Sequence, residues 1–98
     1  MARVIFNPLG SSVAAYGTIA TADASRSKLL IQTRSGQIIY LTPLFPGQTS
    51  TINFALNPPG DFIFFTRADD PELVAAEWTA ECESGLKFLY STMEVLDE

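Results

Sequence analysis

The sequence contains no histidine, and this absence excludes more chemistry than any other feature of its composition. Histidine is the most common general base in enzymes and the most common metal ligand in proteins. Without it, neither a Ser-His-Asp nor a Cys-His nucleophilic system can form. The single cysteine, Cys82, cannot complete a tetrahedral zinc site of nitrogen and sulfur ligands within one chain. We therefore predict a protein that is not an enzyme and that has no catalytic residues, no metal site and no cofactor.

Long apolar runs and disulfide bonds are also missing. One cysteine cannot form an intrachain disulfide, which fits a reducing compartment. The apolar run Val4-Ile5-Phe6 stops at Asn7-Pro8, far short of a signal peptide. No run approaches the roughly 18 apolar residues that span a bilayer. We expect synthesis in the cytoplasm and no membrane partner. The net charge of −5 disfavours nucleic acid and anionic lipid surfaces.

What the sequence does contain is a series of short β-like segments in one domain, residues 1–98. Turn residues recur at short intervals, and the segments between them are rich in β-branched and aromatic residues, which favours an all-β sandwich or barrel. We predict a single-domain antiparallel β-sandwich, immunoglobulin-like or jelly-roll-like, with about seven or eight short strands. The expected strands are residues 3–6, 13–20, 28–33, 37–42, 51–56, 62–67, 73–82 and 86–95.

Two Ser-Gly pairs predict hairpins. A three-residue loop that ends in a glycine with positive φ suits both Arg34-Ser35-Gly36 and Glu83-Ser84-Gly85. In the second hairpin this loop places Ala80 opposite Phe88 and Trp78 opposite Tyr90 on one apolar face. The apolar residues change parity after Tyr90, from even to odd positions, which predicts a β-bulge near residues 91–92.

Residues 71–83 admit two interpretations. Asp70 as N-cap, Pro71 at the first position and Gly85 as terminator favour a helix, which would make the fold α+β. The alternation of apolar and polar residues from Val74 to Glu83 favours a strand. We prefer the strand and keep the helix as the alternative.

Charge is distributed unevenly along the chain. Residues 1–60 carry four basic and one acidic side chain, a net charge of +3, whereas residues 61–98 carry two basic and ten acidic ones, a net charge of −8. Such a split attracts a second copy or a basic partner over a Debye length of about 8–10 Å. The prediction holds only if the fold keeps the two kinds of charge apart in space.

Four apolar residues are candidates for a protein interface. Leu44 and Phe45 lie between two prolines, and a rigid apolar loop loses little entropy when it docks on a neighbour. The alternative is that this loop covers one end of the sandwich. Val4 and Phe6 belong to an N-terminal segment that forms either an ordinary edge strand or a strand added to another subunit's sheet.

Aromatic residues suggest a second kind of site. Trp78 and Tyr90, together with Tyr16 and Tyr40, are candidates for a platform on which a sugar ring stacks. The alternative is that aromatic residues at strand alternation fill the core.

These observations favour a structural or assembly protein over a ligand-binding module. We expect a chain that self-associates, in a ring such as a trimer, or that decorates a larger particle such as a viral capsid or tail and so enters a virion. The alternative is a small β-sandwich module that binds glycans or other ligands.

Overall fold

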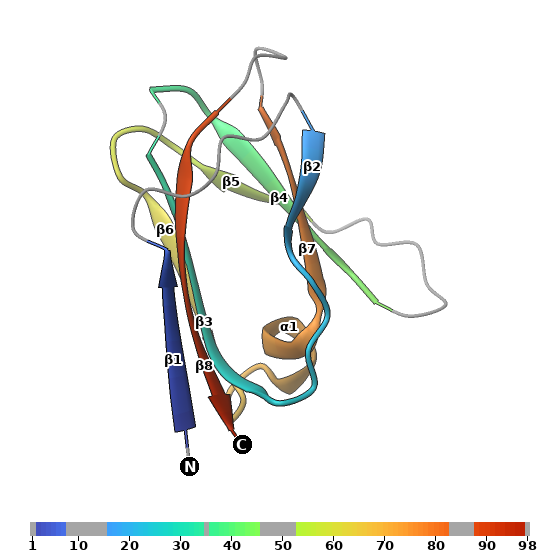
Figure 1. Ribbon diagram of the computed structural model, residues 1–98. Helices are drawn as coiled ribbons and strands as arrows, with labels where there is room; N and C mark the ends of the chain where they lie inside the picture. Colours follow the sequence, from blue (N-terminus) through green and yellow to red (C-terminus); the bar gives the residue numbers. More distant parts are fainter. Residues whose placement is uncertain (1, 8–15, 35, 46–52, 83–87, 98) are drawn as a thin grey trace.

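A computed structural model describes residues 2–7, 16–34, 36–45, 53–82 and 88–97, which form two four-stranded antiparallel sheets that face each other (Figure 1). The first sheet has the order β1 (Ala2–Asn7), β8 (Tyr90–Asp97), β3 (Arg26–Thr33) and β6 (Phe62–Thr66). The second has the order β2 (Tyr16–Ala20), β7 (Glu77–Cys82), β4 (Ile39–Leu44) and β5 (Phe54–Leu56). A short helix, α1 (Pro71–Ala75), lies at the end of the sandwich where β1 starts and β8 ends. The predicted all-β antiparallel sandwich is confirmed.

The strand pairing is that of a jelly roll. β1 pairs with β8, β2 with β7, β3 with β6 and β4 with β5, as in one long antiparallel ribbon. The ribbon is rolled up so that β8 also pairs with β3, and β7 also pairs with β4. Eight strands in two sheets joined in this way make a jelly roll rather than an immunoglobulin-like sandwich.

Neither predicted hairpin forms. β3 belongs to the first sheet and β4 to the second, so the segment that contains Gly36 crosses between sheets, and Gly36 does not have a positive φ. β7 and β8 are likewise in different sheets, and Trp78 lies opposite Pro43 and Ala20 instead of Tyr90. Residues 83–87, which include the predicted second loop, lie outside the described residues. The hairpins were predicted from the alternation of apolar and polar residues. This alternation shows which side of a strand is apolar, but it does not show which strand lies beside it.

The segment 71–82 combines the two structures that its sequence favours. Helix α1 begins at Pro71, and the amide of Val74 donates to the Asp70 carbonyl at 3.0 Å, although the Asp70 side chain makes no cap bond. The chain leaves the helix at Ala76 and enters β7 at Glu77. The predicted strand over 73–82 is therefore wrong for residues 73–76 and confirmed from Glu77 onward. A single helical turn precedes the strand and begins the return of the chain across the sandwich.

No bulge interrupts β8 near residues 91–92. Its pairing with β3 is continuous from Tyr90 opposite Thr33 to Val95 opposite Lys28, and the register shift lies in β3 between Arg26 and Lys28. The predicted bulge is wrong because the change of parity has another cause. The core side of β8 carries Tyr90, Thr92 and Glu94, opposite the fully buried Thr33, Ile31 and Leu29 of β3. The apolar residues at odd positions of β8 therefore point away from the core.

The core lies between the sheets and draws on both. Trp78 of β7 is fully buried and stacks on Phe65 of β6 at 5.3 Å between ring centroids. Phe54 of β5 contacts both rings, at 5.7 Å from Trp78 and 5.8 Å from Phe65. The indole Nε1 donates to the Leu73 carbonyl of α1 at 2.9 Å, which satisfies the only polar atom of the ring. The aromatic cluster thus fixes the distance between the sheets and holds the helix.

Candidate interaction surface

The side of the first sheet that faces away from the core is apolar. On β3, Leu29 and Ile31 are fully buried in the core, so Leu30 between them points to the outer side. Leu30 lies opposite Met93 of β8 and Phe64 of β6, and Met93 lies opposite Phe6 of β1. One row of four apolar side chains, Phe6–Met93–Leu30–Phe64, therefore crosses the entire outer side of the sheet.

The rows on either side of this one extend the apolar area. On one side Val4 lies opposite Val95, and on the other side Phe62 lies opposite Gln32. The four outermost residues are strongly exposed: 61% for Val4, 60% for Phe6, 55% for Phe62 and 45% for Phe64. We call these side chains together the apolar face, which consists of Val4, Phe6, Leu30, Phe62, Phe64, Met93 and Val95. Lys28 lies at one side of this face, beside Val95.

The apolar face has the size of an interaction site. Four strands about 4.8 Å apart make a band roughly 19 Å wide. Three half-exposed phenylalanines of about 200 Å² each, together with Val4, leave roughly 400 Å² of apolar surface in contact with water. An apolar patch of this size is comparable to the largest patch on a typical monomer, and such patches are often functional.

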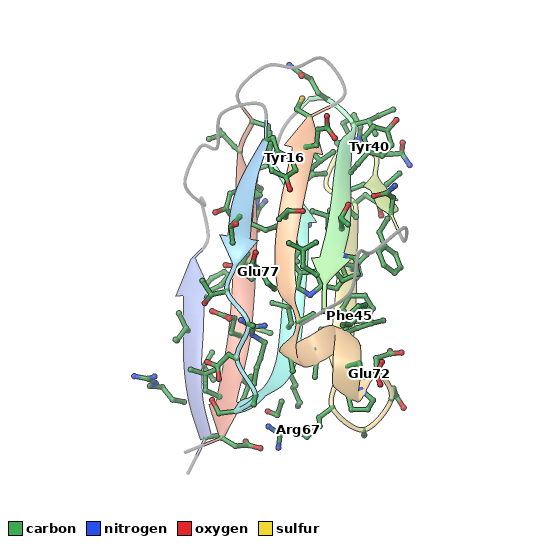
Figure 2. All side chains as sticks on the ribbon, turned by 90° about the vertical axis from the view of Figure 1, so that its right-hand side faces the viewer. Tyr16, Tyr40, Phe45, Arg67, Glu72 and Glu77 are labelled. Carbon is green, nitrogen blue, oxygen red and sulfur yellow. The ribbon has the colours of Figure 1, made fainter. Side chains whose placement is uncertain are left out.

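The four predicted interface residues divide between two places. Val4 and Phe6 belong to the apolar face. Leu44 is half buried at the end of β4, in the second sheet, opposite Glu77. Phe45 is partly buried and packs against the core, beside α1 (Figure 2). The structure thus brings Val4 and Phe6 together with other apolar residues and separates them from Leu44 and Phe45, while the role of all four in an interface stays a prediction.

Phe45 also lines a pocket of about 470 Å³ next to α1. Its other walls are alanines and the side chains of Asp23 and Glu72. The Asp23 carboxylate accepts hydrogen bonds from the Ser25 hydroxyl at 2.6 Å and from the Ser25 amide at 2.9 Å. These hydrogen bonds from Ser25, with a smaller contribution from the nearby charge of Arg26, hold the pKa of Asp23 below its ordinary value.

The predicted stacking platform is not formed by Trp78 and Tyr90. Trp78 is 0% exposed and Tyr90 is 7% exposed, so neither ring offers a face to a ligand in solution. Burial raises the pKa of Tyr90 above its ordinary value of 10.0. Two other tyrosines lie on the outer side of the second sheet, where Glu81 of β7 stands between Tyr16 of β2 and Tyr40 of β4 in one row (Figure 2).

The fold interleaves the two halves of the charge split: Arg26 of the first half pairs with Glu94 of the second. The strands of the second sheet carry Glu77 and Glu81 and no lysine or arginine, a net charge of −2. The strands of the first sheet carry three basic residues and two acidic ones, a net charge of +1; these are Arg3, Arg26, Lys28, Glu94 and Asp97. Because Arg26 is buried and pairs with Glu94, the two sheets differ in charge chiefly through Glu77 and Glu81 of the second sheet.

Neither a metal-binding cluster nor a membrane-spanning helix occurs among the described residues. In the part of the chain that the structure describes, no three acidic or cysteine side chains are grouped so as to hold a metal ion. The only cysteine is buried, and its thiol donates to the Gln37 side-chain oxygen at 2.7 Å. Within the same residues, no helix has the length and hydrophobicity needed to cross a bilayer.

Fold and surface together define a jelly-roll β-sandwich with one exposed apolar sheet face. No family model matches the chain, and no curated protein or solved structure matches it.

Most of the apolar face was missed by sequence reasoning, although signals for it exist. Phe62-Ile63-Phe64-Phe65 and Leu29-Leu30-Ile31 are apolar at both parities, so one side of each strand must be apolar away from the core. In β8 the change of the apolar residues from even to odd positions at Met93 likewise indicates apolar side chains on the outer side. Each signal points to an apolar outer side, but only the strand order shows that the three strands are neighbours.

Proposed function

We propose that this chain is a non-enzymatic structural protein that assembles with copies of itself through the apolar face. The observation that supports this proposal is the unbroken apolar row Phe6–Met93–Leu30–Phe64 across the outer side of the first sheet. If the outer side of this sheet only faced solvent, polar residues would be expected at these positions. Here the polar alternation is replaced by phenylalanine, leucine and methionine on four adjacent strands.

The energetics favour two apolar faces packed against each other. Covering roughly 400 Å² on each of two copies contributes about 20 kcal/mol at about 25 cal/mol per Å². Association costs about 4–15 kcal/mol in lost translational and rotational freedom, besides the ordering of side chains. The total of about 800 Å² is small for a stable interface, so the contact we propose is a weak one that a second contact can reinforce. Sheets that pack face to face across about 10 Å bury side chains of this size well.

Lys28 sets a limit on how the two copies are placed. A lysine directly opposite its own copy would be repelled, so the two faces must be offset or rotated until each Lys28 reaches the solvent at the rim. Its long aliphatic stem allows the ammonium group to do so while the methylene groups cover apolar surface. The contact we propose is therefore apolar at its centre and charged at its edge, as protein interfaces generally are.

Two central substitutions test this contact. Leu30→Lys and Met93→Lys each place a charge in the middle of the apolar face, on strands that are not at the edge of the sheet. Sedimentation velocity at micromolar concentration should show an oligomer for the wild-type chain and a smaller species for both variants. Ala55→Lys adds the same charge at an exposed position of β5 and should leave the oligomer intact. A wild-type chain that stays monomeric at low and high salt would contradict the proposal.

A larger particle is the alternative occupant of the apolar face. Jelly rolls form viral capsid domains and lectins, and a capsid or tail subunit that decorates a virion would expose such a face before assembly. This narrower function depends on an analogy between folds, which does not by itself define a function. Chains that remain monomeric alone but bind a purified capsid through Leu30 would favour decoration over self-association.

A ligand-binding module is the second candidate function, and one row of residues favours it. Tyr16, Glu81 and Tyr40 are adjacent on the outer side of the second sheet, and Tyr16 is 61% exposed. Two phenol rings with a carboxylate between them offer stacking and hydrogen-bond acceptance to a sugar. Chemical-shift changes at these residues on adding oligosaccharides, lost in Tyr16→Ala, would support this function; a glycan array without hits would exclude it.

A further inference from the structure

The two sheets differ in how their edge strands are protected. In the second sheet, β2 contains Gly17 and a register shift between Thr18 and Ala20, and β5 has only three residues. Bulges and short edge strands are devices that prevent pairing with another chain. In the first sheet, the edge strands β1 and β6 are six and five residues long, and their pairing with β8 and β3 is regular.

The sequences of β1 and β6 also contain few protective residues. β6 reads Phe-Ile-Phe-Phe-Thr, without charge or proline, and β1 contains Arg3 as its only charged residue. Val4, Ile5 and Phe6 are all exposed, at 61%, 40% and 60%. A long, regular, apolar edge strand is a template for pairing with another strand. On β6 the Phe62 amide donates to its neighbour Asp61 at 3.0 Å and the Thr66 carbonyl accepts from the Asp70 amide at 2.8 Å, so a second strand must displace the Asp61 side chain and pairs mainly with the middle of β6.

We propose that β1 of one copy pairs with β6 of a second copy, so that the first sheets of neighbouring chains join into one continuous antiparallel sheet. The strand directions allow this without rotation of the second copy. The four strands of the first sheet alternate in direction, so β1 and β6 at its two edges run in opposite directions. A copy placed beside the first in the same orientation therefore presents β6 antiparallel to β1.

Residue types select one register for this pairing. When Val4 lies opposite Phe64, Ile5 lies opposite Ile63 and Phe6 opposite Phe62, so three apolar pairs form in succession. A shift by two residues in one direction places Arg3 opposite Arg67, and like charges in cross-strand pairs are destabilising. The opposite shift places Ile5 opposite Asp61. The outward residues of the two strands meet in the favoured register, so the apolar face continues from one copy to the next.

This inference rests on the proposed self-association and specifies a second contact for it. Because β1 and β6 are different surfaces, the contact is head-to-tail, and each copy uses both of its edges. Such contacts close into a ring when the rotation per copy allows it and otherwise form a filament. A row of chains joined in this way presents one extended apolar face, which increases the area available for packing against another row.

Cysteine cross-linking tests the pairing when it is done in the Met93→Lys background, which removes the face-to-face contact, because Val4 and Phe64 also belong to the apolar face. Directly opposed residues in antiparallel strands have Cβ atoms about 4.5–5.5 Å apart, within reach of a short bifunctional maleimide. A mixture of Val4→Cys and Phe64→Cys chains should give a cross-linked dimer, and the double variant should give a ladder of multimers. Cys82 is buried, so the wild-type chain is the blank. Val4→Cys mixed with Ala55→Cys, on the short edge strand β5, should give no cross-link.

Two outcomes overturn the inference. Efficient cross-linking of Val4→Cys with itself would show that two β1 strands pair around a two-fold axis. The absence of any cross-link between Val4→Cys and Phe64→Cys chains, at concentrations where the wild-type chain is oligomeric, would show that the edges do not pair.

A second variant separates this contact from the face-to-face contact. Ile5→Lys adds an inward-pointing charge to the edge strand, a natural form of edge protection, and lies outside the apolar face. We expect Ile5→Lys to remove the multimer ladder when it is added to the Val4→Cys/Phe64→Cys chain, whereas Ile5→Val keeps it. If Ile5→Lys has no effect on oligomer size while Met93→Lys gives monomers, the edge inference fails and the proposed function stands. Thermal melts of each variant confirm that it is folded.

Discussion

The guanidinium group of Arg26 donates from Nε to the carboxylate of Glu94 at 2.7 Å, although the two residues are 68 positions apart in the chain. Arg26 is 1% exposed, so this is an almost completely buried cation. Its other nitrogens donate to three backbone carbonyls, those of Val74 at 3.0 Å, Ala76 at 3.1 Å and Thr21 at 2.6 Å. One side chain thereby connects β3, β8, the exit of α1 and the end of β2.

We predict that loss of this arginine destabilises the fold strongly. Arg26→Met should lower the free energy of unfolding by about 3–5 kcal/mol, because Glu94 and three carbonyls lose their donor in a buried place. Arg26→Lys should recover little of this loss, since one ammonium group cannot reproduce a planar set of five donors. Urea denaturation measures both variants. An Arg26→Met chain as stable as the wild type would contradict the structural role.

The Phe45 side chain gives a prediction that separates core from interface. Because Phe45 packs against the core, Phe45→Asp should lower the free energy of unfolding by roughly 1–3 kcal/mol, less than for a fully buried phenylalanine. Self-association through the apolar face should persist in the chains that remain folded. Chemical denaturation and sedimentation velocity of the same samples measure the two effects. Lost association with unchanged stability would instead make this loop a contact site.

Ser25 controls the titration of Asp23. The Ser25 hydroxyl and amide both donate to the Asp23 carboxylate, so removing the hydroxyl in Ser25→Ala should move the pKa of Asp23 upward, toward its ordinary value of 3.8. A depressed pKa in the folded state contributes stability above the unfolded pKa, and this contribution is lost as pH falls through the folded value. NMR titration of the carboxyl carbon measures the shift; Asp61→Asn is a control that leaves Ser25 in place.

Tyr90 makes the fold sensitive to alkali. Burial raises its pKa above 10.0, because ionisation would place a phenolate inside the sandwich. The neutral phenol is therefore stabilised by folding, and this contribution is complete below the unfolded pKa and lost as pH rises through the folded value. Tyr90→Phe should show a smaller loss of melting temperature above about pH 10 than the wild type. Tyr16→Phe, which changes an exposed ring, is the matched control.

The sequence was sufficient for the all-β sandwich and for the side of β7 that faces the core. Trp78, Ala80 and Cys82 alternate with polar residues, and all three are buried. The N-terminal segment with Val4 and Phe6 was expected at an edge and forms an edge strand of the first sheet. These features depend on residues close to each other in the chain, since alternation with a period of two and turn residues are local signals.

The helix at residues 71–75 shows where local signals compete. Pro71 and Glu72 favour the start of a helix, while the alternation that begins at Val74 favours a strand. The helix forms at Pro71 and Glu72, and the strand forms where the alternation is regular. The change from helix to strand occurs at Ala76, whose carbonyl accepts a hydrogen bond from Arg26. This long-range contact, which no local pattern contains, holds the chain at the point where helix changes to strand.

The sequence by itself determined that the chain is a β-sandwich, that histidine takes no part in its chemistry, and that the alternating residues of β7 face inward. Only the tertiary structure decided which strands are neighbours, and with that the jelly-roll order, the buried pair of Arg26 and Glu94, and the apolar face. The reason is that alternation specifies a side of a strand and not its partner, so strands with the same alternation are interchangeable in sequence. Phe6, Met93, Leu30 and Phe64 become one surface only when β1, β8, β3 and β6 lie side by side.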